Sequence, residues 1–188
     1  MRILHTSDWH LGMPLKLGTM LADQQYFLDQ LYSIIEEYDV DAVICAGDIY
    51  DSSVTNAEAI ELYSSAITKI CKELGKKMIV IAGNHDSGAR LASGRELLEM
   101  AGLYVSGKIV KDTRPVSIGN ADIYPIPFYS SAEFATYAAE SEQYSMLFPS
   151  DSGFQVVSVM ALAFCYLLIF FLFIPLTCLY FCTLNNKN

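Results

Sequence analysis

The chain has 188 residues, of which 53% are hydrophobic, and its 12 Lys and Arg residues against 21 Asp and Glu residues give a net charge of -9. This composition excludes a disordered, collagen-like or basic-tail protein, and the length suits one domain with a terminal appendage. An acidic chain has no broad basic face, so a nucleic-acid partner would have to be held by metal ions, a local patch or a second protein. The five cysteines form no CxxC pair and we expect no secretory signal, which together predict a cytoplasmic location.

The composition changes abruptly after residue 151. No Asp, Glu, Lys or Arg occurs from residue 152 to residue 186, and most positions there are large and apolar. A run of this length is enough to cross a bilayer, so membrane association through residues 156–182 is one alternative. We favour a shifted reading frame, because no cluster of Lys or Arg flanks the run to set an orientation. We therefore divide the chain into a domain at residues 1–151 and a hydrophobic tail at residues 152–188.

Before the tail, short apolar runs alternate with segments of helical periodicity. Thr55 and Glu58 form a predicted capping box at the start of one helix, Ile60 belongs to its apolar stripe, and Gly75 ends it. Ser93 is the predicted N-cap of a shorter helix. In chain order, the predicted elements are a strand at 2–6, a helix at 23–38, a strand at 42–46, a helix at 56–74, a strand at 78–82, a helix to residue 100, and short strands at 116–118 and 121–125. This alternation predicts an α/β fold with parallel strands covered on both faces.

Polar side chains follow each of the first three predicted strands. Asp8 and His10 follow the first strand, Asp48 follows the second, and Asn84 and His85 follow the third. The carboxyl ends of parallel strands meet at one edge of a sheet, so we expect these groups to be neighbours. Asp8 and His10 lie two apart in a segment we expect to be extended, which would point both side chains the same way. Mixed nitrogen and oxygen ligands suit manganese, zinc or iron better than calcium.

Three motifs carry a resemblance to a known family. They are D-x-H at residues 8–10, G-D-x-x-D at residues 47–51 and G-N-H-D at residues 83–86. Together they resemble the calcineurin-like metallophosphoesterases. The flanking residues MRILHTSDWHLG, AGDIYDS and IAGNHDS are similar to the SbcD components of bacterial SbcCD nucleases, over residues 1–128. The resemblance implies a sandwich of β-sheets flanked by helices, of which this chain would hold the N-terminal part and be incomplete at the C-terminus.

The resemblance also implies an activity and partners. Members of this group are phosphodiester hydrolases that use two divalent ions, usually Mn²⁺, as exonucleases on double-stranded DNA ends and endonucleases on hairpins in repair, recombination and replication. They act with an SbcC-type ATPase subunit, as a homodimer within a heterotetramer. Carried over by motif, Asp8, His10 and Asp48 bind metal with Asn84, and His85 is the catalytic residue.

Five other residues lie in or near the motifs. Asp51 and Asp86 are expected to hydrogen-bond loop backbone or to orient ligand histidines. Arg90 is either a phosphate contact or a surface charge. Tyr50 is either a core residue or a surface on which a DNA base stacks, and His5 is expected to be a packed core histidine.

The chain departs from the family in its histidines. The family completes its site with three further histidines from later motifs, whereas this chain has only three histidines and none after His85. We therefore expect a weak second metal site and a truncated, impaired enzyme. Two alternatives stay open: a general phosphoesterase acting on nucleotides or phosphoproteins, and a non-catalytic fragment attached to a membrane.

Overall fold

The computed structural model describes residues 1–16, 18–133, 137 and 180–183 of the chain. The described part is built on a five-stranded sheet with the strand order β6-β5-β4-β1-β9. Four neighbouring strands are parallel, and β9 pairs antiparallel with β1. The strands are β1 (Arg2–Thr6), β4 (Ala42–Ala46), β5 (Lys77–Ile81), β6 (Leu103–Ser106) and β9 (Tyr180–Thr183).

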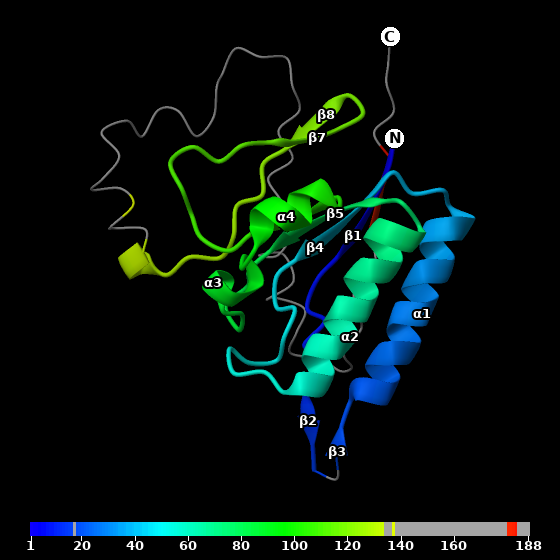
Figure 1. Ribbon diagram of the computed structural model, residues 1–188, viewed down its shortest axis with the longest axis vertical. Helices are drawn as coiled ribbons and strands as arrows, with labels where there is room; N and C mark the ends of the chain where they lie inside the picture. The colour runs from blue at the N-terminus through cyan, green and yellow to red at the C-terminus, as the bar shows by residue number, and fades with distance from the viewer. Residues whose placement is uncertain (17, 134–136, 138–179, 184–188) are drawn as a thin grey trace.

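Helices connect the parallel strands and pack on one face of the sheet. Helix α1 lies beside α2 in front of β1 and β4 (Figure 1). A π-helical segment, η1, continues α2. The helical elements are α1 (Leu21–Glu37), α2 (Ala57–Ile67), η1 (Thr68–Glu73), α3 (Gly88–Leu91) and α4 (Arg95–Met100). The β-α-β alternation predicted from the sequence is therefore confirmed.

Two apolar clusters hold the layers together. The larger joins one face of the sheet, including Leu4 and Val43, to buried helical residues such as Leu28 and Leu31. The smaller covers the opposite face, where a ribbon of β7 (Val116–Ile118) and β8 (Ala121–Ile123) packs on the sheet. The α/β class and the flanked parallel sheet are thus as predicted. The ribbon formed by β2 (Pro14–Leu15) and β3 (Gly18–Thr19) was not anticipated from the sequence.

Details of the predicted helix ends and faces were wrong. The N-cap of α2 is Asn56, whose side chain accepts a hydrogen bond from the Ala59 amide, while the Thr55 hydroxyl donates to a carbonyl within the preceding loop. Ile60 is exposed rather than part of the apolar stripe. The N-cap of α4 is Gly94, in a left-handed conformation, instead of Ser93. Thr55 and Asn56 are both suitable N-caps for α2, and the path of the entering loop decides between them; at α4 the left-handed entry favours glycine.

The predicted membrane segment lies almost entirely outside the described residues. Of residues 156–182, the structure describes only the last three, which belong to β9. In the part of the chain that is described, no helix combines the length and the apolar character needed to cross a bilayer.

Candidate metal and phosphoester site

The candidate site forms where the loops after β1 and β4 run side by side. The Asp8 amide donates to the Gly47 carbonyl at 3.0 Å, and the His10 amide donates to the Asp48 carbonyl at 2.9 Å. Both loops leave the carboxyl ends of neighbouring parallel strands, as the sequence predicted. This backbone pairing places residues that are about forty positions apart in direct register.

The ligand candidates have an unusual backbone conformation. Asp8, His10 and Asp48 have φ angles of 56°, 43° and 50°. Non-glycine residues rarely occupy this left-handed region, and each costs about 1–3 kcal/mol. The expectation that Asp8 and His10 lie in an extended segment is therefore wrong, because left-handed turns rather than strand alternation aim their side chains.

Two glycines allow the loops to come this close. Gly47 has a φ of 93°, and a Cβ placed there would lie 2.9 Å from the Gly83 Cα. A Cβ at Gly83 would overlap the Asp48 carboxylate and its backbone nitrogen. The loop after β5 therefore packs directly against Asp48 because residue 83 has no side chain.

Asp8, His10 and Asp48 form a cluster with the composition of a metal site. One ligand atom from each side chain lies within 4.8 Å of the other two. The His10 Nε2 atom is 3.8 Å from Asp8 Oδ1, so this nitrogen faces the carboxylates. Burial raises the pKa of Asp48, against a hydrogen bond from the His85 amide that lowers it. A divalent cation would offset the cost of holding two carboxylates together at a partly desolvated position.

The position of the other ring nitrogen of His10, Nδ1, also fits a metal site. His10 Nδ1 is buried without a hydrogen-bond partner, and it lies 3.5 Å from Asp51 Oδ1. Histidine ligands commonly turn their second nitrogen towards a carboxylate, which orients the ring. A small closure of this gap would complete that arrangement, so the residues present fit a divalent metal ion.

His85 lies next to the cluster. Its amide donates to Asp48 Oδ1 at 2.9 Å, and its Nδ1 lies 2.8 Å from the Asp51 carbonyl. A carbonyl oxygen can only accept, so Nδ1 carries the hydrogen and Nε2 is left for other chemistry. This hydrogen bond is the main cause of a raised His85 pKa. The His85 and His10 rings meet edge to face with their centres 5.0 Å apart.

Asp86 and Arg90 connect the loops. The two carboxylate oxygens of Asp86 accept hydrogen bonds from the amides of Ile49, Tyr50 and Gly83 at 2.9–3.1 Å. Arg90 Nη1 donates to the Ser53 carbonyl at 2.5 Å. The guanidinium thus has a protein partner, and contact with phosphate stays a prediction.

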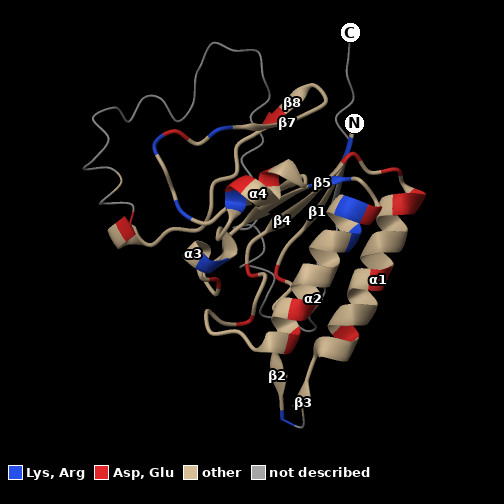
Figure 2. Ribbon diagram, viewed as in Figure 1, with Lys and Arg blue, Asp and Glu red and all other residues tan. Residues whose placement is uncertain are grey.

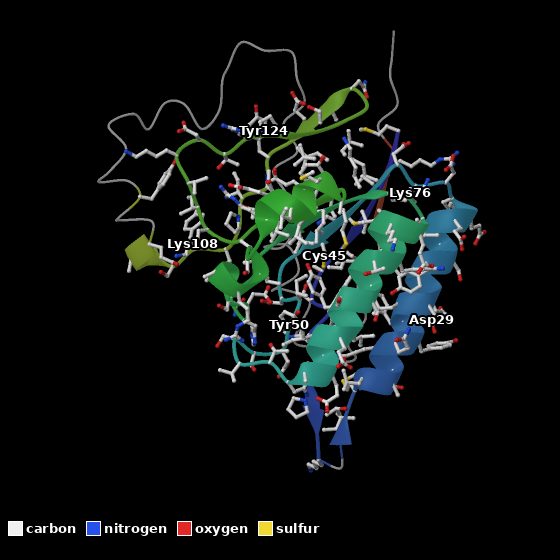
Figure 3. All side chains as sticks on the ribbon, in the orientation of Figure 1. Asp29, Cys45, Tyr50, Lys76, Lys108 and Tyr124 are labelled. Carbon is white, nitrogen blue, oxygen red and sulfur yellow. The ribbon has the colours of Figure 1, made fainter. Side chains whose placement is uncertain are left out.

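The remaining candidates lie around this centre. Asn84 is exposed on the loop that carries His85. Tyr50 lies beside α2 (Figure 3) and is buried against the Tyr63 ring, so it is a core residue. Trp9 is buried, and its indole nitrogen donates to the Thr6 hydroxyl. His5 lies half-buried in β1, and burial lowers its pKa.

Gln24 is a supporting residue that the sequence reasoning missed. It is buried on α1, where its side-chain oxygen accepts from the Gly12 amide and its nitrogen donates to the carbonyls of Trp9 and His10. These hydrogen bonds hold the loop after β1 in place. The available signal was a polar residue on the apolar face of α1, four positions before Leu28.

The fold and the convergent acid and histidine groups define a metal-dependent phosphoesterase class. The chain belongs to the calcineurin-like phosphoesterase family, whose pattern it matches over residues 1–175.

Within that class it is similar to the SbcD component of the SbcCD nuclease of Staphylococcus saprophyticus subsp. saprophyticus, with 37% identity over 150 residues. This similarity covers 78% of the chain and 40% of the staphylococcal protein. The chain therefore spans well under half the length of this curated relative.

Proposed function

We propose that this protein is a metal-dependent DNA nuclease subunit of the SbcD type. The observation that carries the proposal is the convergence of Asp8, His10 and Asp48 beside His85, on the loops that follow the strands of a calcineurin-like phosphoesterase. Similarity to a component of the SbcCD nuclease supports DNA as the substrate. In this proposal residues 1–151 carry the nuclease chemistry and residues 152–188 are the hydrophobic tail, of which residues 180–183 form β9 of the sheet.

The residues divide the work according to their geometry. Asp8, His10 and Asp48 would hold divalent metal, with Mn²⁺ our choice, and Asn84 would add a ligand for a second and weaker ion. When bound, such ions activate water and neutralise phosphate charge. With Nδ1–H held by the Asp51 carbonyl, His85 in its protonated, imidazolium form would donate the Nε2 proton to the leaving oxygen and return to the neutral Nδ1–H form.

The acidic surface suggests that this protein needs partners to bind DNA. Acidic residues recur along α1, and acidic and basic residues lie side by side on α4 (Figure 2) and in η1. We propose that DNA binding relies on an SbcC-type ATPase subunit and on a second copy of this chain. Leu97 and Met100, three positions apart on α4, are 73% and 85% exposed and would lie in a contact between copies. Light scattering should show a dimer that Leu97→Glu weakens; a monomer at high concentration would contradict this part.

The central test is cleavage by the purified chain. Because no histidine follows His85, we expect Mn²⁺-dependent cutting of a plasmid hairpin to be weak, and Asp48→Ala and His85→Ala to abolish it. The exposed Glu61→Ala variant should match the wild type and serves as the control. Hydrolysis of nucleotides or phosphoproteins without hairpin cleavage would favour a general phosphoesterase. No Mn²⁺ binding by calorimetry would refute the metal site itself.

A further inference from the structure

Four hydrogen bonds from side chains of the segment after β5 join this segment to the loop after β4. Asp86 holds the amides of residues 49 and 50, His85 Nδ1 donates to the carbonyl of Asp51, and Arg90 donates to the carbonyl of Ser53. Each contact joins a side chain of the β5 segment to the backbone of the β4 loop. These contacts join the two segments, and the one from Arg90 to Ser53 lies farthest along the sequence of both.

Arg90 acts on the exposed end of this loop. Ser53 and its neighbour Ser52 are exposed, and the side-chain hydrogen bonds of Ser52 and Thr55 stay within the loop. Arg90 reaches across from α3. A guanidinium keeps its charge at all ordinary pH values and donates in a fixed geometry, so it suits a permanent tether better than lysine does.

Asp51 lies on the loop two residues before Ser53, and its amide donates to the Leu11 carbonyl at 3.3 Å. Its carbonyl fixes the Nδ1–H form of His85, and its carboxylate lies 3.5 Å from His10 Nδ1. Ser53 follows Asp51 by two residues, so a shift of the loop end moves both contacts together. A displacement of about 1 Å is enough to reduce a rate by about a hundredfold when it misplaces reacting groups.

We propose that Arg90 is a positioning residue, which sets the orientation of His85 and His10 by holding the Asp51 loop through Ser53. The inference rests on the proposed phosphodiester chemistry of His85. It assigns Arg90 a role through the protein backbone instead of a direct contact with substrate phosphate.

The experiment compares Arg90→Ala and Arg90→Lys with the wild type and with Arg95→Ala, which removes an exposed arginine five positions away. Side-chain nitrogen NMR of the metal-free protein reads which ring nitrogen of His85 carries the hydrogen. Steady-state hydrolysis of bis-p-nitrophenyl phosphate with Mn²⁺ separates kcat from KM. Thermal melting confirms that each variant is folded.

For Arg90→Ala we expect the His85 spectrum to change from the Nδ1–H form to a mixture of forms. We also expect kcat to fall about tenfold or more with KM within about twofold, as for residues that orient metal ligands. Arg90→Lys should recover part of both signals, and Arg95→Ala should resemble the wild type.

An unchanged His85 spectrum in folded Arg90→Ala would overturn the proposal. So would a rise in KM with kcat unchanged, because that result would indicate a direct phosphate contact. If the wild type hydrolyses no phosphodiester, the proposed function fails, yet the NMR comparison still decides whether Arg90 positions His85.

Discussion

Replacing Asp86 with alanine should separate the two loops that form the site. Its carboxylate accepts from three backbone amides, at Ile49, Tyr50 and Gly83. Ile49 and Tyr50 are buried, so water cannot freely replace the lost acceptor. An unsatisfied buried donor costs about 1–3 kcal/mol, and charged acceptors lie at the upper end. We therefore expect Asp86→Ala to lower the free energy of unfolding by about 3–5 kcal/mol.

Urea denaturation followed by circular dichroism measures this loss. Asp86→Asn keeps one acceptor oxygen, so its loss should be about half as large. Asp29→Ala is the surface control: Asp29 accepts a hydrogen bond from Gln25 on the exposed side of α1, and its removal should change stability by at most about 0.5 kcal/mol. Mn²⁺ affinity, measured by calorimetry on folded Asp86→Asn, should fall by about 10–100-fold.

The result that would refute this reasoning is a loss below about 1 kcal/mol in Asp86→Ala. The three amides would then have other partners, and the carboxylate would not hold the loops together. A large stability loss with unchanged Mn²⁺ affinity in Asp86→Asn would separate folding from the site, and would contradict the claim that this loop contact positions the ligands.

Three further predictions test neighbouring features. Gly83→Ala should lower the free energy of unfolding by about 2 kcal/mol or more, because the added Cβ overlaps the Asp48 backbone and carboxylate. It should also abolish Mn²⁺ binding in calorimetry. Wild-type Mn²⁺ affinity in this variant would contradict the close packing. Asn56→Ala should cost about 1 kcal/mol in thermal unfolding, while Asn56→Asp retains the cap of α2; equal losses would dispute the cap. Burial raises the pKa of Cys71 to about 11 from 9.0, so iodoacetamide should label it about a hundredfold more slowly at pH 8 than a free thiol, by mass spectrometry; rapid labelling would show an exposed thiolate.

The sequence predicted the sheet well because burial imposes a simple pattern. The strand at residues 42–46 is a continuous apolar run, the strand at residues 2–6 has an apolar centre, and the structure has both at the predicted positions. Parallel strands bring their carboxyl ends together, so the meeting of Asp8 and Asp48 followed from topology alone. The capping of α2 was harder, since Thr55 and Asn56 are both good N-cap residues and only the loop path selects Asn56.

Contacts between loops could not be read from periodicity. Gln24 serves the site from a helix whose other inward positions are apolar, and no local pattern reveals which backbone groups its amide will meet. The contact of Arg90 could not be predicted from periodicity either, because its partner is the Ser53 carbonyl on a different loop. Such contacts depend on where two irregular segments cross, which only the folded chain defines.

The backbone conformations of Asp8, His10 and Asp48 show why those loop contacts matter. Three left-handed residues together cost about 3–9 kcal/mol, which is comparable to the whole stability of a small domain. Hydrogen bonds offset this cost. They are made between the paired loop backbones, by the Asp86 carboxylate and by the Gln24 side chain. The protein itself therefore holds these three side chains in a strained arrangement, and in the proposed site a metal ion would meet side chains already close together. Because the loops are already ordered, metal binding would lose less free energy to ordering them.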